Sequence, residues 1–280
     1  MKTTKTILLI CSVLCFATSC KKEVDMTLMQ KTIFENADIR QIEIGDAWEA
    51  TIVYDSLTSF VELEYSAYLE PYLKATMEGS KLEIGFTGNV HPTINSVYRA
   101  KIHTNKIEKI EAEDAAQLNF AGHFSATSDT LYVDLDDAST CSGLDYSGHV
   151  CEISIEDASH FLDFQLTGYN CEVKVSDAST CKGNFDMSFH LVADLSQASQ
   201  FVTFGGTAHN GLIRLQDASL LNIAQTQVNE MFVNLSGTSE ATVQVTELME
   251  GTLTEASTLY YKGNPEINVD WSDDSQLIPF

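Results

Sequence analysis

The chain has 280 residues, of which 44% are hydrophobic and only 4 are proline. This length and composition suit one large or two small globular domains and exclude a disordered or proline-rich chain. The formal net charge of −24 at pH 7 disfavours nucleic acid, polyanionic polysaccharide and anionic lipid as partners, because like charges repel.

Residues 1–19 have the features of a secretory signal peptide. Lys2 and Lys5 form a basic start, and Ile7 to Phe16 form an apolar run that is too short to span a bilayer stably. No later apolar stretch is long enough to cross a membrane.

Three small residues lead directly to Cys20, and this order resembles a bacterial lipobox. The resemblance implies cleavage before Cys20 and fatty acylation of its thiol, with palmitate as an expected acyl chain, so that the lipid anchors the protein in a membrane. An ordinary signal peptide with an incidental Cys20 is the alternative. Cleavage would remove two lysines and no acid, which takes the formal charge from −24 to −26. Residues 20–32 are then expected to form a tether.

Residues 33–100 contain runs in which apolar and polar residues alternate, a pattern that indicates strands with one buried face. The runs are Ile39–Ile44, Trp48–Tyr54, Phe60–Tyr65 and Lys81–Phe86. The step Glu78-Gly79-Ser80 indicates a hairpin turn before the last run. We therefore expect β-hairpins over 33–100, followed by short strands at Val97–Ile102 and Ile107–Glu111.

A repeat with a period near 20 residues occupies 101–280. The phrase Asp-Ala-Ser begins at residues 137, 157, 177 and 217, and Gln-Ala-Ser begins at 197. Degenerate copies begin at 114, 237, 255 and 273. A fixed period of this length is typical of a solenoid, in which each repeat is one rung.

Two features of the rung indicate β-structure. Late in each rung come apolar pairs two residues apart, such as Ile153/Ile155 and Val173/Val175, with a polar residue between them. Two residues after each phrase comes a second apolar column that includes Phe161. Because a lone rung cannot bury these columns, stacking must do so. The sequence predicts an all-β fold, a single-stranded right-handed parallel β-helix of about eight rungs and about 40 Å, preceded by N-terminal β-hairpins.

The Asp-Ala-Ser phrase is expected to be a turn. We predict that its alanine points inward at a tight corner, while aspartate and serine cap turn amides or form a hydroxyl ladder. Replacing Ala178 with leucine should then overpack the corner and cost about 1–3 kcal/mol. The predicted turn residues are Ala138, Ser139, Ala158, Ser159, Ala178, Ser179, Ala198, Ser199, Ala218 and Ser219.

The aspartates of this turn form a candidate metal site. Asp137, Asp157 and Asp177 lie on consecutive rungs, and carboxylates ~5 Å apart would attract a hard cation such as Ca²⁺. A solvated acidic edge that caps turns is the alternative and the preferred interpretation, so no cofactor is expected.

The mature chain has four cysteines besides Cys20. Cys151 and Cys171 are one period apart, whereas Cys141 and Cys181 are two periods apart and too distant to bond. Buried free thiols are the preferred interpretation, and a Cys151–Cys171 disulfide is the alternative.

The aromatic side chains offer a candidate binding strip for a sugar or a protein, with core packing as the alternative. The candidates are Tyr146, Tyr169, Tyr260 and Tyr261. A polysaccharide lyase is the natural enzyme alternative for a β-helix, but it needs clustered acids beside a basic residue. The basic residues of 114–280 do not share one column; they are Lys174, Lys182, Arg214 and Lys262.

The stretch Leu69-Glu-Pro-Tyr-Leu73, then Glu78-Gly-Ser-Lys-Leu-Glu-Ile84 and the repeats resemble the family "putative auto-transporter adhesin, head GIN domain". The resemblance covers about 33–280 and implies an exported β-helix of the kind common among Bacteroidetes lipoproteins, with no established ligand or catalytic residue. Members usually carry Gly-rich turns where this chain has Asp-Ala-Ser.

We therefore expect a non-enzymatic lipoprotein of the bacterial outer membrane that acts as an adhesin or ligand-binding module for an unknown protein or glycan. A periplasm-facing structural or signalling partner and a lyase-like enzyme are the alternatives. The sequence leaves open whether the protein faces the periplasm or the cell surface.

Overall fold

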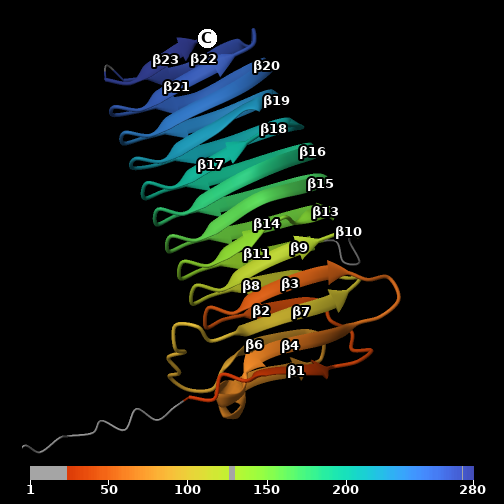
Figure 1. The fold of residues 1–280 in the computed structure, drawn as a ribbon. Helices are drawn as coiled ribbons and strands as arrows, with labels where there is room; N and C mark the ends of the chain where they lie inside the picture. Colours follow the sequence, from red (N-terminus) through yellow and green to blue (C-terminus); the bar gives the residue numbers. More distant parts are fainter. Residues whose placement is uncertain (1–23, 126–129, 273) are drawn as a thin grey trace, which may run out of the picture.

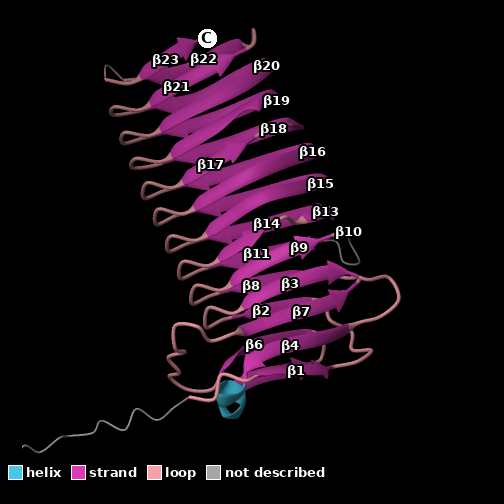
Figure 2. Cartoon of the chain, viewed as in Figure 1, coloured by secondary structure: helices cyan, strands magenta, loops and turns pink. Residues whose placement is uncertain are grey.

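The computed structural model describes residues 24–125, 130–272 and 274–280. The predicted signal peptide, Cys20 and Asp273 lie outside the described residues. The chain forms a parallel β-solenoid of about 8 turns, with β1 at one end of the stack and the C terminus at the other (Figure 1). Within the described ranges, strands make up nearly all of the regular structure, and the one helix lies at the N-terminal end (Figure 2). No helix among the described residues is both long and apolar enough to cross a bilayer.

The elements have the following bounds: β1 (Leu28–Ile33), β2 (Gln41–Ile44), β3 (Glu49–Tyr54), β4 (Phe60–Ser66), η1 (Ala67–Tyr72), β5 (Leu73–Glu78), β6 (Lys81–Phe86), β7 (Tyr98–Thr104), β8 (Lys109–Ala112), β9 (Gln117–Ala121), β10 (His123–Ser125), β11 (Thr130–Leu135), β12 (Thr140–Ser142), β13 (Asp145–Ser147), β14 (Val150–Ile155), β15 (His160–Val175), β16 (Thr180–Leu195), β17 (Gln200–Thr203), β18 (Gly206–Leu215), β19 (Leu220–Leu235), β20 (Glu240–Leu253), β21 (Thr258–Lys262), β22 (Glu266–Trp271) and β23 (Gln276–Pro279).

Each rung has two faces and two edges. The first face holds the strand segment after each Asp-Ala-Ser turn, such as β12 and β13, and the second face holds the segment before the next turn, such as β14. We call the edge with the Asp-Ala-Ser turns the turn edge. The opposite edge, where the chain bends from the first face to the second at residues such as 148–149 and 168–169, is the bend edge. The stacked turns are visible along one side of the ribbon (Figure 1).

Consecutive rungs pair in parallel, with most residues opposite the residue 20 positions earlier. Phe161 lies between Cys141 and Cys181, and Val173 follows Ile153. All five of these side chains are buried, as period-two alternation predicts. A parallel stack therefore turns each apolar column of the sequence into one continuous core, and the all-β solenoid prediction is confirmed.

The N-terminal end has a different topology. On the first face, β1, β4 and β7 pair antiparallel, and on the second face β5 and β6 form an antiparallel hairpin at Gly79-Ser80. These elements agree with the predicted hairpins. Antiparallel strands and η1 thus close this end of the solenoid.

Two strands of the predicted hairpin part belong to the stack itself. β2 lies parallel between β6 and β8, and β3 lies parallel between β7 and β9. Residues 41–54 therefore form a rung that is inserted between two rungs that follow it in the chain. A division at residue 100 does not match this pairing, because strand order in space differs from strand order in sequence.

The predicted tether also needs correction. Residues 28–32 belong to β1, which pairs with β4 over six residue pairs from Leu28↔Ser66 to Ile33↔Val61. The pairing partner is distant in sequence, so the local composition of 20–32 did not reveal the strand.

The four cysteines are buried free thiols, and Cys151 lies opposite Cys171 in adjacent strands. Burial raises the pKa of Cys141, Cys171 and Cys181, because a thiolate would lose its hydration. We therefore expect these thiols to be unreactive in the folded protein.

Candidate functional site

The Asp-Ala-Ser phrases that begin at residues 137, 157 and 177 form type I′ turns at the turn edge. In the rung at 137, Asp137 and Ala138 have φ of 50° and 61°, and the Ser139 N–H donates a hydrogen bond to the Asp136 carbonyl over 3.2 Å. Left-handed φ at both central residues defines this turn type.

The inward residue of the turn is serine, and the prediction of an inward alanine is wrong. Ala138 is exposed, whereas Ser139 is buried with 0% of its surface exposed. The same holds in the rungs at 157, 177, 197 and 217. The two central residues of a type I′ turn form its tip, so Ser139 is the first residue that can point inward. Cys141 follows two residues later on the same face.

Turn atoms bond mostly to neighbouring turns. The Ser139 and Ser159 N–H groups donate to the hydroxyls of Ser159 and Ser179, each over 3.1 Å. The Ser139 hydroxyl also donates to the Ser159 hydroxyl over 3.4 Å, so one step of the predicted hydroxyl ladder is present. The Ala138 N–H donates to the Asp157 carbonyl of the next rung over 2.8 Å. The phrase therefore shapes and links the rungs.

The acidic cluster on the turn edge consists of Asp136, Asp137 and Asp157, each offering an oxygen within 4.8 Å of the others. Asp177 of the predicted column is not among them, although its charge helps to raise the pKa of Asp157, for which Asp136 is the main cause. Ca²⁺ takes six to eight oxygens, so the three exposed carboxylates would need bidentate binding or added water ligands to complete a site. A solvated acidic edge is still the interpretation that we prefer for the cluster.

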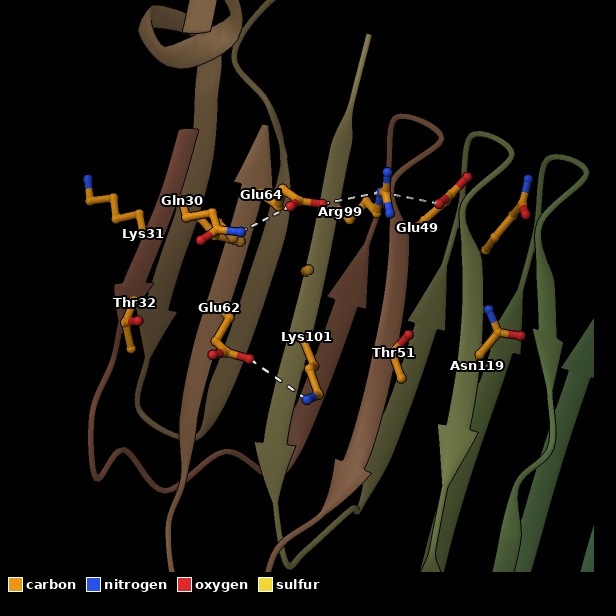
Figure 3. Close-up of a pocket in the computed structure, with 13 residues that line it drawn as sticks. Gln30, Lys31, Thr32, Glu49, Thr51, Glu62, Glu64, Arg99, Lys101 and Asn119 are labelled. Carbon is orange, nitrogen blue, oxygen red and sulfur yellow. Dashed lines mark hydrogen bonds and ion pairs between the residues drawn. The ribbon is translucent and has the colours of Figure 1, made fainter. Parts of the chain in front are cut away.

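A polar groove lies on the first face near the N-terminal end and encloses about 680 Å³. It crosses β1, β4, β7, β3 and β9 (Figure 3). Its lining residues are Gln30, Lys31, Thr32, Glu49, Thr51, Glu62, Leu63, Glu64, Arg99, Ala100, Lys101, Gln117 and Asn119.

Charged side chains alternate across the polar groove in two rows (Figure 3). In one row Arg99 Nε lies 3.6 Å from Glu64 and 3.9 Å from Glu49. In the other row Lys101 Nζ lies 3.9 Å from Glu62. The volume suits a small polar ligand, and mixed donors and acceptors suit hydrogen bonding. Sequence reasoning missed this groove because β3 lies between strands that come later in the chain.

Along the bend edge, four aromatic side chains stack in one column, which we call the ring column: His149, Tyr169, Phe189 and His209. Ring centroids are 5.1 Å apart for the first pair, 5.0 Å for the second and 6.1 Å for the third, with interplanar angles of 2°, 15° and 18°. Asn229 continues the column, because its side-chain amide lies 3.2 Å from Nδ1 of His209.

Of the four tyrosines of the predicted aromatic strip, Tyr169 alone is exposed. Tyr146 is buried, and burial raises its pKa to about 12. Tyr260 and Tyr261 are half-buried in β21, and Tyr261 packs against the core. The ring column could have been found in the sequence by following the 20-residue period through the bend, where positions 149, 169, 189 and 209 are all aromatic or histidine.

Two of the four basic residues of the repeat share a column after all. On the second face, Asp194 lies between Lys174 and Arg214 in register. Arg214 pairs with Asp194 over 3.0 Å, and Lys174 pairs with Glu172 over 2.8 Å. Ion pairing accounts for both residues, and neither lies at the acidic cluster.

Comparisons with solved structures support the same architecture. A putative adhesin from Parabacteroides merdae matches with a TM-score of 0.68 and 13% identity, covering 92% of this chain and 98% of the other. With the same coverage of each chain, a putative adhesin from Parabacteroides distasonis matches with a TM-score of 0.66 and 16% identity. A structure described as a putative lipid binding protein, also from P. distasonis, matches with a TM-score of 0.67 and 14% identity, covering 92% of this chain and 98% of the other. At these identities the likeness shows the fold.

No curated protein matches this sequence. The model of one family does match, over residues 38–265, which is most of the chain. The turn-linked solenoid with its N-terminal hairpins therefore belongs to the family "putative auto-transporter adhesin, head GIN domain".

Proposed function

We propose that this protein is a non-enzymatic adhesion module, held at the bacterial outer membrane by a lipid on Cys20. The observation that carries the proposal is the position of the chain ends. The described chain begins beside β1 at the closed end of the solenoid, and the C terminus lies at the far end (Figure 1). A lipid attached just before β1 would hold the closed end at the membrane and direct the rungs away from it.

The surfaces of the solenoid suit binding. The polar groove lies near the anchored end, and the ring column lies farther along the shaft. Both are accessible in a molecule that projects from a membrane. Family membership supports adhesion as the role, and the acidic surface disfavours nucleic acid as a partner.

Fractionation of cells tests the anchor. The Cys20→Ala variant should move from the membrane fraction to the soluble fraction, because it lacks the acylated thiol. Cys15→Ala is the matched control, since this cysteine lies within the apolar run of the signal peptide, and it should stay in the membrane fraction. A Cys20→Ala protein that remains with the membrane would refute lipid anchoring.

Protease treatment of intact cells tests the adhesion role. A surface adhesin should be degraded while a periplasmic marker protein survives. Survival of the protein under conditions that remove a known surface protein would favour the alternative, a structural or signalling partner that faces the periplasm.

A further inference from the structure

We propose that the ring column and the shallow pocket beside it bind a neutral polysaccharide, whose chain runs along the solenoid axis. This proposal rests on the proposed function as a binding module and names the chemical class of its ligand.

The rings of the column are accessible. His149 and His209 are exposed, Tyr169 is 39% exposed, and Phe189 is half-buried. Near-parallel planes with centroids 5.0–5.1 Å apart show that neighbouring rings stack on one another, as aromatic pairs do in proteins, so the column presents a continuous aromatic edge to solvent. Tyr169 lies at a register irregularity between Gly168 and Asn170, and such bulges re-aim side chains at sheet edges.

The spacing of the rings suits an extended sugar chain. Rings recur once per rung, at about 4.8 Å along the axis, which is close to the advance of one pyranose in an extended β-linked chain. The apolar C–H faces of successive sugars would therefore meet successive rings. A globular ligand would contact one or two rings and would gain nothing from the column.

The pocket beside the column supplies hydrogen-bonding groups. It encloses about 550 Å³, and Ser147, Thr167 and Ser188 contribute hydroxyls to its lining. Gly148 and Gly168 also line the pocket, and a Cβ on Gly168 would lie only 2.9 Å from the Gly148 carbonyl oxygen, so a side chain at residue 168 would crowd this site. Hydroxyls beside uncovered rings are the groups that a sugar needs for its polar edges and its apolar faces.

The charge distribution of the protein favours a neutral ligand at this pocket. None of the described residues that line this pocket is aspartate, glutamate, lysine or arginine, whereas the polar groove is lined by glutamates, lysines and an arginine. The whole chain has a formal charge of −24, so its field repels acidic polysaccharides within about a Debye length. A neutral chain meets no such barrier.

Native gel electrophoresis with polysaccharide cast in the gel tests the proposal. The sample is the mature chain with Cys20→Ala, and the probes are hydroxyethylcellulose, galactomannan, xyloglucan and yeast mannan, with polygalacturonate as the acidic probe. We expect slower migration of the protein in at least one neutral gel and unchanged migration in polygalacturonate. In the retarding gel, the double variant Tyr169→Ala/Phe189→Ala should bind with about a tenfold or greater rise in Kd, since two aromatic contacts are lost.

The matched control is Tyr132→Ala/Phe232→Ala. These rings are 44% and 43% exposed and lie on the second face, away from the column, so the control should bind as the parent does. A second variant, His149→Ala/His209→Ala, removes the two exposed ends of the column and should also weaken binding. Circular dichroism of each variant shows whether the solenoid is intact, and the second variant provides the test if the first does not fold.

Three results would overturn the proposal: no retardation in any neutral gel, retardation that survives in both column variants, or retardation in polygalacturonate alone. These results leave the proposed function standing if fractionation still places the protein at the membrane through Cys20 and protease still reaches it on intact cells. If the protein binds a neutral polysaccharide through the ring column but is neither attached to the membrane nor exposed on the cell surface, the proposed function fails and the polysaccharide site stands.

Discussion

Substituting Ala178 with glycine distinguishes an exposed from an inward alanine, because the two interpretations predict changes of opposite sign in the free energy of unfolding. Its φ is 61° and its side chain is exposed at the tip of the turn. This left-handed conformation costs a non-glycine residue about 1–2 kcal/mol, whereas glycine adopts it without that cost. Glycine also makes the unfolded chain more flexible, which costs about 0.4–1 kcal/mol. Ala178→Gly should therefore raise the free energy of unfolding by about 0.5–1 kcal/mol.

An inward alanine would give the reverse result. Glycine would then remove a buried methyl group, worth about 0.8 kcal/mol, and would add the same unfolded-state flexibility, so the protein would lose about 1–2 kcal/mol. Ala193→Gly is the matched control for that case, because Ala193 is in β16 with 0% of its surface exposed. It should destabilise.

Thermal unfolding followed by circular dichroism measures the difference, with the soluble Cys20→Ala protein as the parent. A change of 1 kcal/mol shifts Tm by about 2–4 °C in a chain of this size. Ala138 and Ala178 lie two rungs, or about 10 Å, apart. The double variant Ala138→Gly/Ala178→Gly should roughly double the increase in stability, because the effects of distant substitutions are additive. A fall in Tm for Ala178→Gly that matches the fall for Ala193→Gly would refute the exposed turn tip.

Four further predictions concern the turn edge and the core. Ser179→Ala should lower stability by about 1 kcal/mol, because the Ser179 hydroxyl accepts a hydrogen bond from a buried backbone N–H. Ser239→Ala should be neutral or stabilising in the same thermal unfolding assay, because the Ser239 hydroxyl is buried and has no hydrogen-bond partner among the described residues. Asp157→Asn should stabilise the protein at pH 7. Neighbouring carboxylates, chiefly Asp136, repel the ionised Asp157 side chain and so raise its pKa, and asparagine removes this repulsion. That part of the gain should vanish as the pH falls through the aspartate range, since the protonated acid is no longer repelled, whereas a gain from the turn preference of asparagine would persist in melts at either pH. Thiol titration of the non-reduced Cys20→Ala protein should detect four thiols after denaturation and almost none before it; two after denaturation would indicate the Cys151–Cys171 disulfide.

The polar groove and the ring column show why the surface was harder to predict than the core. Outward residues obey no hydrophobic period, so nothing in the order of the chain marks Arg99, Glu64 and Glu49 as neighbours. They meet because β3 inserts beside β7, and β4 pairs with β7 on its other side. The ring column was more accessible to sequence reasoning, since Tyr169 and Phe189 are 20 residues apart like the rungs themselves.

The sequence alone determined the solenoid, the length of its rungs and the places where its strands turn. It could do so because burial of a column such as Cys141, Phe161 and Cys181 requires the same chemistry at the same phase of every rung. Only the tertiary structure decided that Ser139 rather than Ala138 points inward, because that depends on left-handed φ at the turn tip. It also decided that residues 41–54 insert out of chain order, since strand pairing joins edges in space whatever their distance in sequence.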